Sequence, residues 1–164
     1  MAAMPVIDFE PHFADAFRTL NEAWITRFFA MEPKDAELIG DPQGQILDKG
    51  GHVFFAMGEG AQAGGEPVGC VALIAMADGG FEVAKMAVSE ASQGRGHAKA
   101  LMAACIERAR SLGAPRLYLE SNEILTPARA LYRAFGFTDL EPERRPPSPY
   151  SRANVWMELL LQQA

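Results

Sequence analysis

The segment from residue 81 to residue 113 constrains the fold of this chain more than any other part of the sequence. It begins with the apolar run FEVAKMAVSE, which is typical of a buried strand. Residues 92–101, SQGRGHAKAL, then place two glycines and several small residues around charged ones. From residue 98 onward an apolar stripe at helical spacing consists of Ala98, Leu101, Met102, Cys105, Ala109 and Leu112. Gly113 is suited to cap that helix, so the segment predicts a strand, a bare turn and a helix.

The rest of the chain alternates strand and helix patterns. Strands are expected at residues 4–8, 50–60, 68–77, 116–121, 137–140 and 154–161, in addition to 81–90. Helices are expected at residues 11–31, at 32–47 with a break at GDPQG, at 98–112, and from Thr126 to Gly136, with Thr126 as the cap and Pro127 in the first position. Turns at 61–67 and 78–80 would join three consecutive strands into a meander. This order predicts one domain spanning residues 1–164, with an α/β fold and a mixed sheet.

Composition narrows the classes of function. The formal net charge of −6 argues against a protein that binds a nucleic-acid backbone. The sequence has no run of 18 apolar residues, and its first residues lack the pattern of a secretory signal, so we expect a cytoplasmic protein without a membrane partner. Cys70 and Cys105 have no CxxC partner, which favours two buried thiols in a reducing compartment.

The turn after the central strand has the properties of an anion site. A helix N-terminus offers unpaired N–H groups and the positive end of the helix dipole, and small residues let an anion come close to them. The turn reads, in order, Gln93, Gly94, Arg95, Gly96, His97, Ala98 and Lys99. It could hold a diphosphate, or it could simply connect two packed elements. It is neither a Walker A loop nor the dinucleotide fingerprint GxGxxG, which would need glycine at position 99.

Several motifs in a fixed order extend this observation. The turn matches the pattern [QR]-x-x-G-x-[GA], and Val88 ends the strand five residues before it. Asn122 follows the next strand, Leu131-Tyr132 lies in the following helix, and Gly136-Phe137 comes after that helix. Over residues 50–140 the sequence thereby resembles the GNAT family of acyl-CoA-dependent N-acyltransferases. Asn122 lies ten residues before Tyr132, a wider spacing than in many members.

The resemblance implies a GNAT fold, with a central mixed sheet of about six or seven strands and helices on both faces, and acetyl-CoA as co-substrate. The backbone of Met86, Ala87 and Val88 would pair with the pantetheine arm as an added strand. The amides of residues 93–99 would hold the pyrophosphate. Asn122 and Ala128 would contact the cofactor, and Tyr132 would lie near the thioester sulfur.

Transfer of an acyl group to an amine needs a base for the amine and an acid for the leaving thiolate. Strand alternation would place Glu82, Ala84, Met86 and Val88 on one face. Histone-acetylating relatives carry a base glutamate six residues before the valine, so the resemblance indicates Glu82 as general base. The alternative is a solvated or ion-paired glutamate. Tyr132 is the candidate acid, because a phenol titrates near 10 in model peptides; the alternative is an ordinary half-buried aromatic.

Other reactive groups in the sequence lack the partners that their chemistry needs. Nothing in the sequence indicates the lowered pKa that Lys85 would need as a nucleophile. His97 has no second histidine or acidic residue at metal-ligand spacing, so no metal site is expected. Ser148 has no GxSxG frame, which argues against a serine hydrolase.

On the acceptor side, the resemblance points to the first two helices and the last hairpin. The candidates there are Trp24, Phe28, Phe29, Glu32 and the loop 144–152. Arg144, Arg145 and Arg152 either bind a substrate carboxylate through a bidentate fork or form a solvated basic loop.

The function that we expect is an acetyl-CoA-dependent N-acetyltransferase acting directly on the primary amine of a small molecule or amino acid. Two alternatives stay open: a protein lysine or N-terminal acetylase, and a catalytically silent acyl-CoA-binding sensor. Many relatives form homodimers, and the sequence leaves the oligomeric state and the acceptor open.

Overall fold

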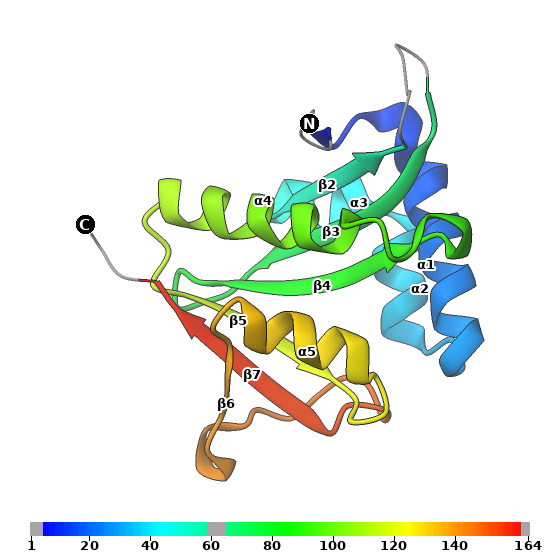
Figure 1. Ribbon diagram of the computed structural model, residues 1–164. Coiled ribbons are helices and arrows are strands. Elements are labelled where there is room, and N and C mark those ends of the chain that lie inside the picture. Colours follow the sequence, from blue (N-terminus) through cyan, green and yellow to red (C-terminus); the bar gives the residue numbers. More distant parts are fainter. Residues whose placement is uncertain (1–4, 59–64, 162–164) are drawn as a thin grey trace.

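The computed structural model describes residues 5–58 and 65–161, which form one mixed sheet with helices on both faces (Figure 1). Within these residues the sheet has seven strands in the order β1-β2-β3-β4-β5-β7-β6. The strands are β1 (Val6–Asp8), β2 (His52–Met57), β3 (Pro67–Ala75), β4 (Phe81–Val88), β5 (Arg116–Ser121), β6 (Thr138–Asp139) and β7 (Val155–Leu160). The helices are α1 (Ala14–Phe28), α2 (Pro33–Gly40), α3 (Pro42–Gln45), α4 (His97–Ser111) and α5 (Thr126–Ala134). The predicted α/β class and mixed sheet are confirmed.

The two halves of the sheet are joined by a very short parallel contact. β1 to β4 form an antiparallel meander, and β5, β7 and β6 form a second antiparallel unit. β4 pairs with β5 only through Phe81 with Leu117 and Glu82 with Tyr118. The strands then separate, so β4 beyond Glu82 has no strand on the side that faces β5. This opening in the middle of the sheet positions the site described below.

A β-bulge interrupts β4 beside the opening. Ala72 lies opposite Ala84, while Cys70 lies opposite Ala87, so Lys85 and Met86 together oppose one residue of β3. Lys85 has a φ of 56°, a left-handed value that is uncommon for a long side chain. The expectation that Glu82, Ala84, Met86 and Val88 share one face is therefore wrong. The extra residue turns Met86 and Val88 toward α4, while Ala84 stays on the α1 face with its cross-strand partner Ala72.

Two apolar clusters cover the two faces of the sheet. One packs the sheet against α4 and includes Leu73, Val83, Leu101, Met102 and Met157. The other packs the sheet against α1 and α2 and includes Phe17, Leu38, Phe55, Cys70 and Ala72. Both cysteines are buried and free, as expected. Leu112 does not belong to the predicted stripe of α4, because the helix ends at Ser111 and leaves this side chain 54% exposed.

The helix starts and ends agree with the sequence signals in part. The predicted break in the second helical segment is confirmed at Asp41, which separates α2 from α3. The proposed cap at Thr126 is wrong: Thr126 is already the first helical residue, and the preceding Leu125 makes no side-chain cap. α5 contains no fully buried residue, because its inner side lies along the opening in the sheet.

Three further features complete the fold. The predicted turn at 61–67 lies largely outside the described residues. Of the described helices, none is both long and apolar enough to cross a membrane.

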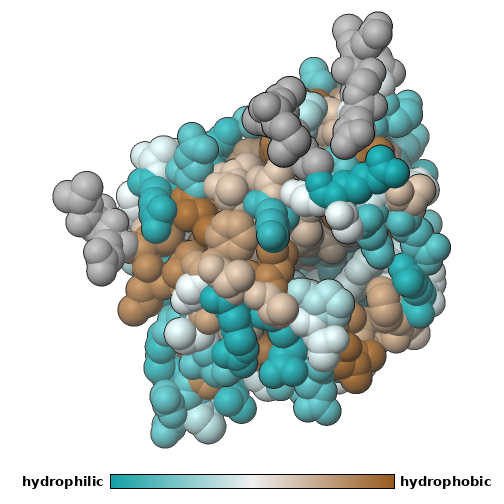
Figure 2. All heavy atoms as spheres, in the orientation of Figure 1, coloured by the Kyte–Doolittle hydropathy of each residue, from teal (hydrophilic) through white to brown (hydrophobic). Residues whose placement is uncertain are grey.

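Apolar side chains gather on one surface over α4 and the end of β7 (Figure 2), where Ile106, Phe135 and Leu159 line a shallow groove.

Candidate active site

A cavity of about 780 Å³ fills the opening between β4 and β5. Its walls come from α1, from β4 between Glu82 and Val88, from the turn before α4, from the end of β5, from α5, and from Tyr150 and Arg152 in the last loop. The cavity therefore reaches both faces of the sheet. Almost all the site residues predicted from the sequence border it, although they come from separate elements.

The turn before α4 has the backbone geometry of an anion cradle. Gly94 and Gly96 have φ values of 79° and 90°, which side chains with a Cβ rarely adopt, and Gly96 is the N-cap of α4. No atom lies within 4 Å of the position that a Cβ on Gly94 would occupy. The side chain of Gln93 fixes the turn by donating from Nε2 to the carbonyl oxygen of Val88 at 3.1 Å. The turn and the first residues of the 15-residue helix α4 border the cavity, and the first amides of a helix have no partner within the helix.

His97 adds a buried polar group beside this turn. It is the first residue of α4, is only 2% exposed and borders the cavity. Its Nδ1 atom has no hydrogen-bond partner within the described part of the chain. A buried imidazole nitrogen normally pairs with a polar group, so this unpaired nitrogen beside the cradle is an unusual feature of the turn.

The free edge of β4 provides a second extended binding element. Met86, Ala87 and Val88 border the cavity beyond the last pair with β5. An extended amide-containing chain can add to such an edge through main-chain hydrogen bonds. A long acyl carrier with a diphosphate at one end matches this edge followed by the cradle, so the residues present fit coenzyme A.

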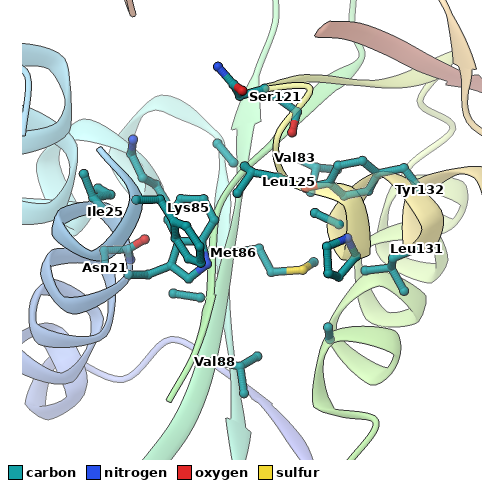
Figure 3. Close-up of a pocket in the computed structure, with 18 of the residues that line it drawn as sticks. Asn21, Ile25, Val83, Lys85, Met86, Val88, Ser121, Leu125, Leu131 and Tyr132 are labelled. Carbon is teal, nitrogen blue, oxygen red and sulfur yellow. The ribbon is translucent and has the colours of Figure 1, made fainter. Parts of the chain in front are cut away.

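Tyr132 approaches the opening from α5. Figure 3 shows its side chain extending from the helix toward β4, on the same side of the strand as Met86. The ring packs against Phe137 with centroids 6.0 Å apart. Burial raises the pKa of Tyr132 to about 12, and the neighbouring Ser121 hydroxyl partly opposes that shift. The phenol therefore keeps its proton at neutral pH and can donate it.

Glu82 enters the opening from the other face. Burial and, after it, the nearby charge of Glu120 raise the pKa of its carboxyl to about 7, against the opposing charges of Lys85 and Lys34. A carboxyl with a pKa near neutral pH can accept a proton and release it again. Glu82 and Tyr132 lie on opposite faces of the sheet and border one cavity.

A buried ionic cluster closes the α1 side of the cavity. Asp35 is fully buried and accepts from Lys85 Nζ at 2.6 Å and from both Nη atoms of Arg152 at 2.9 and 2.6 Å. It also caps α2 by accepting from the Glu32 amide at 2.9 Å. Burial by itself would raise the pKa of Asp35, but the hydrogen bonds from Arg152 and Lys85 outweigh it and lower the pKa to about 2. Tyr150 lies against both cations, with Lys85 Nζ 3.0 Å from its hydroxyl.

Comparison with known proteins agrees with this geometry. The acetyltransferase (GNAT) family profile matches residues 13–137. The chain belongs to the GNAT family. A relative in Escherichia coli K12, described as the uncharacterized N-acetyltransferase YjgM, is 34% identical over 98 residues, which cover 59% of this chain and 58% of the relative. The chain thus matches little more than half the length of that relative.

Solved structures show the same GNAT fold. An acetyltransferase of the GNAT family from Staphylococcus aureus superposes with a TM-score of 0.85 at 16% identity, covering 98% of this chain and all of the other. YncA from Salmonella typhimurium, solved with acetyl-CoA, superposes with a TM-score of 0.74 at 16% identity, covering 99% of this chain and 96% of the other. The predicted family and the GNAT fold are confirmed.

The three arginines of the last loop all have partners within the protein, although Arg144 and Arg145 are exposed to solvent and only Arg152 is largely buried. Arg144 holds Glu158 with both Nη atoms, at 2.5 and 2.9 Å. Arg145 donates to the Leu140 carbonyl oxygen at 3.0 Å and lies over the Trp156 ring. Arg152 is held by Asp35. The exposure of Arg144 and Arg145 agrees with the alternative of a solvated basic loop, whereas Arg152 departs from it because it is paired with Asp35. Binding of a substrate carboxylate by these arginines stays a prediction.

Asn122 supports the cavity wall through two hydrogen bonds within the protein. Its Nδ2 donates to the Arg152 carbonyl oxygen at 2.7 Å, and its Oδ1 accepts from the Ile124 amide at 2.9 Å. It thereby ties the last loop to the turn before α5. Asn122 and Ala128 both border the cavity, and their contacts with a cofactor stay predictions.

Some residues of the site could not be identified from the sequence. Asp35 stands at the position of a helix-capping carboxylate, three residues after Glu32, and that spacing was its only signal. Glu120 and Ser121 end an otherwise ordinary strand. Their importance follows from the opening beside β4, which no local pattern indicates.

Removal of the Asp35 charge tests the ionic cluster. Asp35→Asn is expected to lower the free energy of unfolding by about 3–5 kcal/mol, because Lys85 and Arg152 would remain buried without their counter-charge. The contribution of Asp35 is present at neutral pH and is lost as the pH falls from about 4 toward 2, since its pKa is lowered in the folded state. Urea unfolding at pH 7 measures the loss. Glu37→Gln, on the exposed side of the same helix, is the control and should cost less than about 0.5 kcal/mol. Equal losses for the two variants would contradict the assignment.

Proposed function

We propose that this GNAT protein transfers an acetyl group from acetyl-CoA directly to the primary amine of a small molecule. The observation that carries the proposal is the meeting of Glu82 and Tyr132 in one cavity, from opposite faces, beside a free strand edge and a small-residue turn. A carboxyl with a pKa near 7 and a phenol with a pKa near 12 are a matched base and acid.

The binding roles follow from the two elements that fit coenzyme A. The amides of residues 93–99 hold the pyrophosphate at the N-terminus of α4, where the helix dipole favours negative charge. The backbone of Met86, Ala87 and Val88 pairs with the pantetheine arm along the free edge of β4. Tyr132 then stands beside the sulfur, and Glu82 faces the approaching amine from the α1 side.

The proton transfers balance around a single acyl transfer. Glu82 takes a proton from the ammonium form of the acceptor, directly or through water, so that the amine nitrogen can attack the thioester carbonyl carbon. A carbon–nitrogen bond forms and the carbon–sulfur bond breaks. Tyr132 protonates the leaving thiolate, and the nitrogen gives up its second proton to solvent. The presence of both groups favours this reaction over a silent acyl-CoA sensor.

Substitution of Gly96 tests the cradle. A β-branched residue cannot keep a φ of 90°, so Gly96→Val moves the amides that hold the diphosphate, and we expect acetyl-CoA affinity to fall at least about tenfold. Calorimetry with acetyl-CoA measures it. Gly113→Val is the matched control, because Gly113 has a φ of 72° at the other end of α4, away from the cavity. Equal affinity of the two variants would remove the cradle from the proposal.

Substitution of Tyr132 tests the acid. Tyr132→Phe keeps the ring that packs on Phe137 and removes only the donor hydroxyl, so kcat should fall about 100-fold while acetyl-CoA affinity stays the same. Steady-state thiol release and calorimetry measure the two quantities. A normal kcat would reassign Tyr132 to packing.

Substitution of Glu82 tests the base through the pH profile. For the wild type, kcat/KM should rise with pH through an inflection near 7, because the carboxyl must lose its proton before it can act as a base. Glu82→Gln should lose about 100-fold in activity near pH 8 and should lack the inflection. The loss should shrink at high pH, where the free amine needs no base. A loss of equal size at every pH would indicate a binding role instead.

A further inference from the structure

The part of the cavity bordered by Glu82, Glu120, Lys85 and Arg152, here called the acceptor end, is where the amine would bind in the proposed reaction. Two of these residues, Glu82 and Glu120, are carboxylates. Glu82 comes from β4 and Glu120 from β5, and Glu120 is second only to burial among the causes that raise the pKa of Glu82. Glu120 accepts hydrogen bonds from the hydroxyls of Tyr118 at 2.6 Å and Ser148 at 2.5 Å. Because both of these donors are neutral, they orient the carboxylate and leave its negative charge in place.

The cations that border this end are already neutralised. Lys85 and Arg152 share the buried Asp35, and Arg152 also reaches Glu32 at 3.2 Å. The two positive charges of Lys85 and Arg152 are therefore matched by the two negative charges of Asp35 and Glu32. Both Nη atoms of Arg152 already donate to Asp35, so a substrate carboxylate would have to compete with Asp35 for this guanidinium. Arg27, the next cation along the wall, pairs with Glu90 at 3.0 Å, and Lys99 lies in α4 at the turn.

An aromatic wall stands beside these charges. Trp24, Phe28 and Phe29 contact one another with ring centroids 5.4–6.4 Å apart, and all three border the cavity. Phe28 is 40% exposed, although it is a large apolar side chain. Tyr150 is held across from them by the two cations over its ring. The wall suits an apolar or aromatic body next to a positively charged amine.

We infer that the acceptor is a primary amine with an apolar or aromatic body and no carboxylate beside the amine, which excludes free amino acids. This inference rests on the proposed acetyl transfer and concerns the same site. An ammonium group gains from Glu82 and Glu120, whereas a carboxylate on the neighbouring carbon meets the same two charges. The cations nearest to Glu82 among the described residues, Lys85, Arg152 and Lys34, each already have a carboxylate partner. The carboxylate therefore weakens binding of the ammonium form, and the apolar body is held by the aromatic wall.

The test compares acceptors that share one body. 2-Phenylethylamine, L-phenylalaninamide and L-phenylalanine carry the same ring, and the amide has a neutral carboxamide where the amino acid has a carboxylate. Because the amide also has the less basic amine, the rates are compared per concentration of free amine. With acetyl-CoA and the wild-type protein, kcat/KM from thiol release should be at least about tenfold higher for the amine and the amide than for the amino acid, mainly through KM.

A charge variant links the preference to this site. Glu120→Gln should shrink the preference for the amide over the amino acid at least about threefold, because it removes one of the two repelling charges. Glu123→Gln makes the same charge change at an exposed position that does not border the cavity, and it should leave the preference unchanged.

The outcomes separate this inference from the proposed function. Equal or better turnover of L-phenylalanine, or turnover of polar amines with none of the three probes, would overturn the inference and leave acetyl transfer standing. An unchanged preference in Glu120→Gln would also overturn it. Absence of thiol release with every amine in a broad panel, although acetyl-CoA binds, would overturn the proposed function itself.

Discussion

The separation of β4 from β5 after only two parallel residue pairs is the constraint on which the rest of this molecule depends. A fully paired central sheet would have no free main-chain groups and no passage between its faces. Because pairing stops at Glu82 and Tyr118, β4 keeps a free edge, and the gap beside it becomes the cavity. The turn that follows β4 leads into α4 and borders the same cavity, so the N-terminus of the helix and the strand edge share one site. The free edge of β4, the anion cradle before α4 and the acceptor end of the cavity all depend on the early end of the pairing between β4 and β5.

The bulge at Lys85 and the Asp35 cluster belong together physically. Lys85 holds a left-handed backbone conformation that costs a long side chain on the order of 1–2 kcal/mol, and its amine is buried, which lowers its pKa. Asp35 offsets that burial by accepting from Lys85 and Arg152 at once. The same contacts join α2, the bulge and the last loop around the acceptor end. The cluster therefore positions three distant segments. It also pairs Lys85 and Arg152 with Asp35, so that these two cations are less available to attract a negatively charged substrate.

Chemical roles in this site are set by surroundings more than by residue type. Glu82 and Glu120 are both strand carboxylates, but Glu120 receives two hydroxyl donors, while Glu82 is buried beside it and titrates near 7. Tyr132 has a raised pKa because it is buried at the inner side of α5. When the surroundings give two groups well-separated pKa values, the group with the lower pKa can act as a base and the other as an acid at the same pH. The gap supplies both environments, since each group enters it from a different face.

The sequence by itself determined the local elements and the family. The strand, bare turn and helix around residues 81–113 and the α/β order follow from short-range patterns, because helix periodicity and glycine in turns are encoded by neighbouring residues. The candidate residues Glu82 and Tyr132 came from the resemblance of the motifs to the GNAT family. Tertiary structure alone decided which face each residue occupies beyond Ala84, since one bulged residue reverses strand alternation. It also decided that Arg152 binds Asp35, 117 positions away, in place of a substrate. Such pairings depend on where distant segments meet in space, and no local pattern records that meeting.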